Sequence, residues 1–176
     1  PGLLCEANAM VSSPDDPILE AALAHCHDVT RREGSNFAWG FRFLPPERRE
    51  AMVVLYAFAR ATDDIVDDEE RTLEERRAAI AAWRAALLRA FDGARALDPK
   101  LLAMAEIVRR FDVPREELLL LVEGCEDDLV ERRFATWNET LGYCRKVAGT
   151  VGMAMLPLLG APGSALRAPM LALGNA

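Results

Sequence analysis

One segment, residues 51–68, constrains the fold of this chain more than any other part of the sequence. Its first two thirds are apolar on almost every face, so a helix formed here must be surrounded by other protein segments. Asp63, Asp64 and Asp67 follow, and they would lie toward the C-terminal end of the same helix. The sequence therefore predicts a buried central helix with an acidic end.

The polar side chains of this segment share one face of the predicted helix. At about 100° per residue, four of them fall within a stripe about 60° wide, namely Tyr56, Arg60, Asp63 and Asp67, with Asp64 beside it. Carboxylates on a buried helix repel one another and lose hydration, which costs several kcal/mol for each unpaired ion. The helix C-terminus is also unfavourable for negative charge. One arginine cannot neutralise three aspartates, so the pattern predicts a further positive charge.

A divalent cation that prefers oxygen ligands meets this requirement. Mg²⁺ takes one or two carboxylates, keeps several waters and bridges to substrate phosphates. The spacing therefore predicts a magnesium–phosphate site at Asp63 and Asp67. The alternative is that residues 63–70 form a solvated acidic helix end, which is the state we expect for residues 68–70.

Helix-start signals recur along the chain, and alternating segments joined by hairpin turns do not occur in the sequence. The signals are the pairs Ser13–Pro14, Pro45–Pro46, Asp98–Pro99 and Val113–Pro114, and the capping-box spacings Thr72–Glu75 and Thr136–Glu139. We therefore expect an all-α fold. No long linker divides the sequence, so residues 1–176 are interpreted as one domain. The first methionine is Met10, and we expect residues 1–12 to be disordered or to precede the true start.

Composition narrows the class of protein further. Twenty-one Lys and Arg residues against 28 Asp and Glu give a net charge of −7, which disfavours a nucleic acid partner. Two histidines are too few for a His-rich metal site. Four cysteines without a Cys-x-x-Cys pair indicate reduced thiols in a cytoplasmic protein. Residues 147–166 carry no charge, but glycines and prolines interrupt them, so we expect a buried, broken helix pair and not a membrane span.

Three blocks of the sequence together resemble one family. Residues 63–67, DDIVD, have the form of the first aspartate-rich motif of class I isoprenoid synthases, and LYAFAR leads into them at residues 55–60. Residues 34–49, GSNFAWGFRFLPPERR, are similar to the N-terminal block of the squalene/phytoene synthase family. Residues 143–152, YCRKVAGTVG, are similar to its third block, and all three stand in the family's order.

The resemblance implies an all-α class I isoprenoid synthase bundle around an apolar cavity. It implies a transferase that joins two prenyl diphosphates, farnesyl or geranylgeranyl, head to head into a squalene- or phytoene-type product for carotenoid, hopanoid or sterol synthesis. The implied cofactor is Mg²⁺, with Mn²⁺ as an alternative, and NADPH only if the product is squalene. Prenyl diphosphates are the implied ligands, and downstream isoprenoid enzymes are candidate partners. Oily substrates are compatible with peripheral contact at the inner membrane surface.

The resemblance also implies roles for individual residues. Asp63, Asp64 and Asp67 match the metal ligands, and Tyr56 and Arg60 match positions that contact diphosphate, where an arginine fork suits phosphate oxygens. The remaining matches are substrate-binding positions: Ser35, Asn36, Phe37, Phe41, Tyr143, Gly149 and Gly152. Core packing is the alternative for the two phenylalanines, and close helix packing is the alternative for the two glycines.

Several features limit the resemblance. The family's second aspartate-rich motif does not occur before Ala176, so we expect residues 1–176 to be an N-terminal portion that is inactive alone. Asp127 and Asp128 do not match a metal motif and are interpreted as solvated helix charge. Chain-elongating prenyl diphosphate synthases usually place Arg-Arg-Gly after their aspartates, and residues 68–72, DEERT, differ. A relative that hydrolyses or rearranges a prenyl diphosphate, and a non-catalytic helical interaction module, remain as alternatives.

Overall fold

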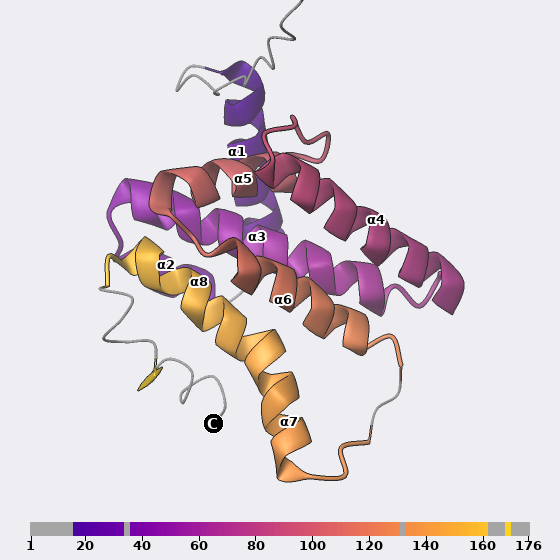
Figure 1. Ribbon diagram of the computed structural model, residues 1–176. Coiled ribbons are helices and arrows are strands. Elements are labelled where there is room, and N and C mark those ends of the chain that lie inside the picture. The colour runs from indigo at the N-terminus through magenta and orange to yellow at the C-terminus, as the bar shows by residue number, and fades with distance from the viewer. Residues whose placement is uncertain (1–15, 34–35, 131–132, 162–167, 170–176) are drawn as a thin grey trace, which may run out of the picture.

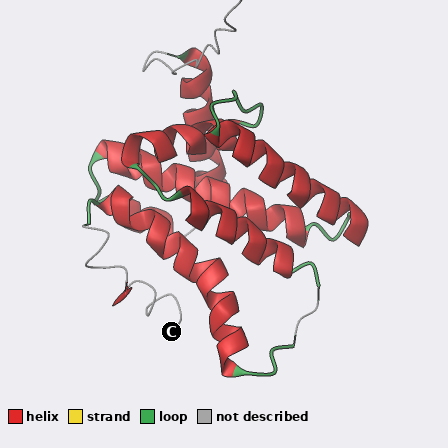
Figure 2. Ribbon diagram, viewed as in Figure 1, coloured by secondary structure: helices red, strands yellow, loops and turns green. Residues whose placement is uncertain are grey.

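The computed structural model describes residues 16–33, 36–130, 133–161 and 168–169 (Figure 1). Regular structure in these ranges is entirely helical (Figure 2), which confirms the all-α prediction. The elements are α1 (Pro17–Arg32), α2 (Asn36–Phe41), α3 (Pro46–Asp67), α4 (Leu73–Phe91), α5 (Pro99–Phe111), α6 (Arg115–Asp127), α7 (Trp137–Cys144), the π-helix η1 (Arg145–Gly149) and α8 (Thr150–Leu159). The segment 1–12 lies outside the described residues.

Most helices begin where the sequence predicts. At the start of α4, the Thr72 hydroxyl accepts a hydrogen bond from the Glu75 amide, and the Glu75 carboxylate accepts one from the Thr72 amide. Asp98 caps α5 by accepting from the amide of Lys100. The prediction for α1 is wrong by three residues, because Asp16 and not Ser13 is the N-cap. Both positions combine a capping side chain with a following proline, and the sequence does not rank them.

The second predicted capping box, at the start of α7, forms only in part. The Thr136 hydroxyl accepts from the Glu139 amide, as expected. The Glu139 carboxylate accepts from the amide of Ala135 and not from that of Thr136. The Thr136–Glu139 spacing therefore predicted the start of α7 correctly. The hydrogen bond accepted by the Glu139 carboxylate comes from the residue before the N-cap and not from the N-cap itself.

Helix α3 occupies the centre of the molecule. It contacts α1, α4, α5, α6 and α8, and it lies between α4 and α5 on one side and α6 and α8 on the other (Figure 1). Nine of its residues are buried, and they are Ala51, Met52, Val53, Val54, Leu55, Ala57, Phe58, Thr62 and Val66. The predicted central, buried helix is confirmed, and the burial of its apolar surface is the main source of stability for this arrangement.

Two contacts fix the rotation of α3 about its own axis near its acidic end. The ring of Phe58 stacks on Trp83 of α4, with centroids 6.1 Å apart. The Trp83 indole nitrogen donates to the Thr62 hydroxyl over 3.1 Å, and that hydroxyl donates to the Phe58 carbonyl over 2.9 Å. Because Thr62 precedes the aspartates directly, this buried contact determines which way their side chains leave the helix.

The uncharged C-terminal segment is less broken than predicted. The helical chain continues from α7 through η1 and α8, with Pro157 inside it, and ends at Gly160 with φ of 71°. Gly149 and Gly152 therefore do not interrupt it, and the predicted second helix of the pair falls mainly on residues outside the described ranges. Within the described part of the chain, no helix combines the length and the apolar composition needed to cross a bilayer.

Candidate functional site

The aspartates at the end of α3 differ in their surroundings. Asp63 is half-buried, whereas Asp64 and Asp67 are exposed, so the expectation of several buried carboxylates holds only for the first of them. The Arg60 guanidinium donates to Asp64 over 2.7 Å and lies 3.4 Å from Glu33 at the end of α1. The single arginine thus neutralises Asp64 and leaves Asp63 and Asp67 without a cationic partner among the described residues.

Asp63 has an unusual hydrogen-bond donor. The Sγ atom of Cys125, on α6, lies 3.1 Å from Asp63 Oδ1. Burial raises the pKa of the Asp63 carboxyl above its ordinary value, the nearby carboxylates of Asp67 and Asp64 raise it further, and the Cys125 hydrogen bond and the Arg60 charge oppose this. The interaction with Asp67 places the two carboxylates within electrostatic reach of each other, as the predicted stripe requires.

Tyr56 lies two turns before the aspartates on the same helix. Its ring is half-buried and packs against the core of the bundle. Arg60 follows one turn later, and its guanidinium contacts Asp64 and Glu33. Their spacing on α3 predicts that both side chains lie on the face that carries Asp63 and Asp67.

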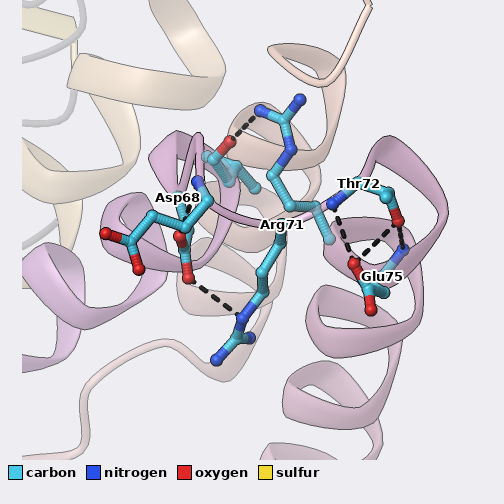
Figure 3. A network of polar contacts seen from close by, with 7 residues as sticks. Asp68, Arg71, Thr72 and Glu75 are labelled. Atoms are coloured by element: carbon cyan, nitrogen blue, oxygen red, sulfur yellow. Dashed lines mark hydrogen bonds and ion pairs between the residues drawn. The ribbon is translucent and has the colours of Figure 1, made fainter.

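The turn after α3 is held by local contacts around the carboxylate of Asp68. Arg71 lies 2.9 Å from this carboxylate, and the turn leads into the Thr72–Glu75 capping box (Figure 3). The Arg76 guanidinium donates to the carbonyl of Val66 over 2.7 Å, which places positive charge at the negative end of the α3 dipole. Asp68 therefore helps to form this turn while its side chain stays part-exposed, and Glu69 and Glu70 are exposed, as expected for a solvated helix end.

A second acidic group lies on α6, facing η1. The carboxylate of Glu117 is 2.6 and 2.7 Å from the Arg145 guanidinium and is almost fully buried. Lys146 donates to Glu123 over 2.6 Å and to Asp127 over 2.8 Å. The interpretation of Asp127 as solvated charge is wrong, because its partner lies 19 residues away on another helix and spacing along α6 cannot reveal it.

Tyr143 on α7 connects this second group to the first. Its ring packs against Phe134 at a centroid distance of 5.3 Å. Burial raises the pKa of the Tyr143 phenol, and a hydrogen bond to Asp128 and the charges of Asp128 and Cys125 raise it further. Tyr143 is therefore within electrostatic reach of Cys125, the thiol that contacts Asp63.

The remaining predicted site residues lie in several places. Ser35 lies outside the described residues, and Asn36 and Phe37 begin α2 with side chains that are also outside them. Phe41 is a buried member of the core, which is the position that its packing alternative requires. Gly149 is buried in η1 and Gly152 is half-buried in α8. The glycine at the tight contact between α6 and η1 is Gly124, where an added Cβ would lie 2.9 Å from Lys146 Cβ.

The described residues can supply only a few protein ligands to a single metal ion. Among the described residues, no group of three or more His, Cys, Asp or Glu side chains is placed to hold an ion. Asp63 and Asp67 offer two carboxylates without cationic partners, and one or two carboxylates with waters and substrate phosphate are what Mg²⁺ ordinarily takes. The donor set therefore fits a hydrated Mg²⁺ shared with a phosphate ligand.

The sequence did not indicate that Cys125 and Arg76 lie beside the acidic end of α3. A signal existed for the burial of Cys125, because Leu118, Leu121 and Val122 precede it at helical spacing on the inner face of α6. Nothing in the sequence indicated that its partner would be Asp63, 62 residues earlier.

Comparison with known proteins places the site in context. The model of the squalene/phytoene synthase family matches residues 30–176. A 15-cis-phytoene synthase of Synechococcus elongatus is 30% identical over 151 residues, which cover 86% of this chain and 48% of that protein. A phytoene synthase of Mycobacterium tuberculosis is 33% identical over 142 residues, covering 81% and 46%. The chain thus spans about half the length of these relatives.

Solved structures agree with this assignment. The squalene synthase HpnC of Alicyclobacillus acidocaldarius superposes with a TM-score of 0.81 at 30% identity, covering 96% of this chain and 62% of that one. A dehydrosqualene synthase in complex with ligand superposes with a TM-score of 0.79 at 23% identity, a likeness of fold. With a family model matched over most of its length, the chain belongs to the squalene/phytoene synthase family.

Proposed function

We propose that the complete protein is a Mg²⁺-dependent transferase that condenses two prenyl diphosphates head to head. The observation that carries this proposal is the acidic end of α3, where Arg60 forms an ion pair with Asp64, while Asp63 and Asp67 form no ion pair with a protein cation among the described residues. The carboxylates lie at the end of a helix whose apolar surface lines the core of the bundle. A charged site beside an apolar interior suits a substrate with a diphosphate head and a hydrocarbon tail.

Each residue of the acidic end has a role in this reaction. Asp63 and Asp67 would hold Mg²⁺, and the chemistry supplied by bound Mg²⁺ is neutralisation of the charge that develops on the leaving diphosphate. Arg60, whose side chain is 41% exposed, can turn its remaining donors to diphosphate oxygens while it keeps its contact with Asp64. Tyr56 would present its hydroxyl on the same face, as its helical spacing predicts. Asp64, held by Arg60, would act as a third ligand only if that ion pair opened.

The apolar part of α3 contributes by excluding water. Ionisation of an allylic diphosphate leaves a carbocation that water would capture. Coupling to a second prenyl chain therefore requires an apolar surface that excludes water beside the charged site. The relatives named above are synthases, which disfavours the hydrolase or rearranging alternative and the non-catalytic module. The proposal includes both farnesyl and geranylgeranyl diphosphate as substrates. It includes NADPH only if the product is squalene.

A product assay on the complete protein tests the proposal. Farnesyl or geranylgeranyl diphosphate would be supplied with and without Mg²⁺ and NADPH, and the organic extract analysed. We expect a squalene- or phytoene-type hydrocarbon that requires Mg²⁺. An alcohol as the sole product, or no turnover of either substrate, would overturn it.

A further inference from the structure

Cys125 is the residue outside the predicted site that makes the most specific contact with it. Its side chain is 1% exposed, and it lies on the inner face of α6 beside Leu121 and Val122. Its Sγ lies 3.1 Å from Asp63 Oδ1, a short distance for a hydrogen bond that involves sulfur. The contact joins two helices across 62 residues of sequence and places a donor against one oxygen of the carboxylate.

The chemistry of a thiol makes this contact different from an ion pair. A thiol is a weak, neutral donor, so it can orient a carboxylate without cancelling its charge. Asp64 shows the opposite case, because its oxygen is held by the Arg60 guanidinium at 2.7 Å and its charge is neutralised. Cys125 is buried among apolar side chains of α6, and its thiol is the donor in the contact with Asp63.

Orientation matters because a carboxylate with free rotation loses entropy when it binds a metal. With Oδ1 of Asp63 held by the thiol, Oδ2 remains available as a ligand and the side chain is already ordered. Groups that hydrogen-bond to metal ligands commonly change metal affinity or activity by about 10- to 100-fold. A buried neutral donor on a rigid helix is suited to this role.

We propose that Cys125 is a positioning residue that orients Asp63 for cation binding through its S–H···O contact. The inference rests on the proposed function, because it assumes that Asp63 binds Mg²⁺. It assigns to α6 a part in the site that neither the aspartate-rich motif nor its spacing implies.

The contact itself can be observed without any activity measurement. Infrared difference spectra of the complete protein, wild type minus Cys125→Ala, isolate the S–H stretching band of Cys125. We expect this band at lower frequency than the band of Cys26, isolated in the same way from Cys26→Ala. Cys26 is a matched control because it is also fully buried, on α1, and its pKa is raised by burial to about 12. In an Asp63→Ala background, the Cys125 band should move toward that of Cys26.

The effect on the cation is measured by thermal unfolding in inorganic diphosphate at increasing Mg²⁺ concentration. Cys125→Val replaces the thiol with an apolar side chain that has no hydrogen-bond donor. We expect this variant to raise the Mg²⁺ concentration needed for half-maximal stabilisation by about tenfold. Cys125→Ser restores a donor and should remain within about threefold of wild type. Cys26→Val perturbs the core in the same way, away from the aspartates, and should leave this concentration unchanged.

The outcomes separate this inference from the proposed function. If wild type is stabilised by Mg²⁺ and Cys125→Val requires no more Mg²⁺ than Cys26→Val does, the positioning role is overturned and the function stands. The same holds if the Cys125 band does not respond to Asp63→Ala. If wild type itself forms no hydrocarbon and gains no stability from Mg²⁺, the proposed function fails, and the role of Cys125 fails with it.

Discussion

Two groups of acidic residues lie on neighbouring helices, one at the end of α3 and one along α6. They differ in whether protein cations pair with their carboxylates. On α6, Glu117 is paired with Arg145, and Glu123 and Asp127 share Lys146. On α3, the half-buried Asp63 accepts a hydrogen bond from the Cys125 thiol and forms no ion pair with a cation among the described residues. Burial, and then the charge of Asp67, raise its pKa, and the Cys125 hydrogen bond and the Arg60 charge lower it.

We interpret the α6 charges as a structural group and, under the proposed function, the α3 charges as the group that binds the cation. Carboxylates with protein cations hold helices together, and they have no charge left for a ligand. Carboxylates that the protein leaves without cations make the folded state less stable and are available to an external cation. Acidic residues alone do not separate the two cases, because the cations on η1 lie far away in the sequence.

The largest expected effect is on catalysis by the α3 group. Asp63→Asn combined with Asp67→Asn should lower kcat/KM of the complete protein by about a thousandfold or more, since metal-assisted charge neutralisation is worth several kcal/mol. The melting temperature should be unchanged or higher, because two repelling charges are removed. Steady-state assays with thermal unfolding would check both. Retention of turnover within tenfold of wild type would contradict the assignment.

The next effect is on stability and concerns the α6 group. Glu117→Gln leaves the Arg145 charge without its carboxylate, and we expect a loss of about 3 kcal/mol in the free energy of unfolding. Glu123→Gln is the matched control: the Glu123 side chain is 43% exposed and Lys146 keeps Asp127, so the loss should be below about 1 kcal/mol. Denaturant unfolding measures both, and equal losses would contradict the structural role of Glu117.

A smaller effect tests the close approach of α6 and η1. Gly124→Ala places a Cβ 2.9 Å from Lys146 Cβ, 3.0 Å from Val147 Cγ1 and 3.2 Å from the Lys146 carbonyl carbon. Because backbone must then move, we expect a loss of about 1–2 kcal/mol. Gly142→Ala on α7 meets nothing within 4 Å and should be neutral or stabilising by up to about 1 kcal/mol. If Gly124→Ala stabilised the protein, the close approach of α6 and η1 at this position would be contradicted.

The smallest effect is a pH dependence of stability without metal. The pKa of Asp63 is raised in the folded state, mainly by burial, so the folded state binds this proton more tightly than the unfolded state does. The resulting stability is present at pH below the unfolded pKa and is lost as pH rises through the folded pKa. Wild type should therefore lose stability relative to Asp63→Asn over this acidic range. A gain with rising pH would contradict the sign.

The fold was largely predictable from the sequence because its signals are local. The Thr72–Glu75 box, the Asp98 cap and the apolar run of α3 each depend on residues within a few turns, and the structure confirms all three. The start of α1 was missed because two proline-containing caps compete within four residues.

The candidate site was predictable only in part, because half of its contacts join distant segments. The stripe on α3 brought Asp63 and Asp67 together through helical geometry alone. The pairing of Arg60 with Asp64 is an i,i+4 contact that helical spacing also supplies. The contact of Arg60 with Glu33, the contact of Cys125 with Asp63, and the pairing of Asp127 with Lys146 depend on how helices pack. Helical spacing cannot supply these partners.

We propose that the α3 aspartates, and not the α6 acids, hold the catalytic cation. The most direct measurement is a crystal structure of the complete protein with Mn²⁺ in place of Mg²⁺ and an unreactive prenyl diphosphate analogue, with the ion located by its anomalous scattering. We predict a peak within about 2.5 Å of an Asp63 or Asp67 carboxylate oxygen, absent in the Asp63→Asn, Asp67→Asn variant. A peak at Glu123 or Asp127, or an analogue bound without any ion near α3, would contradict the account.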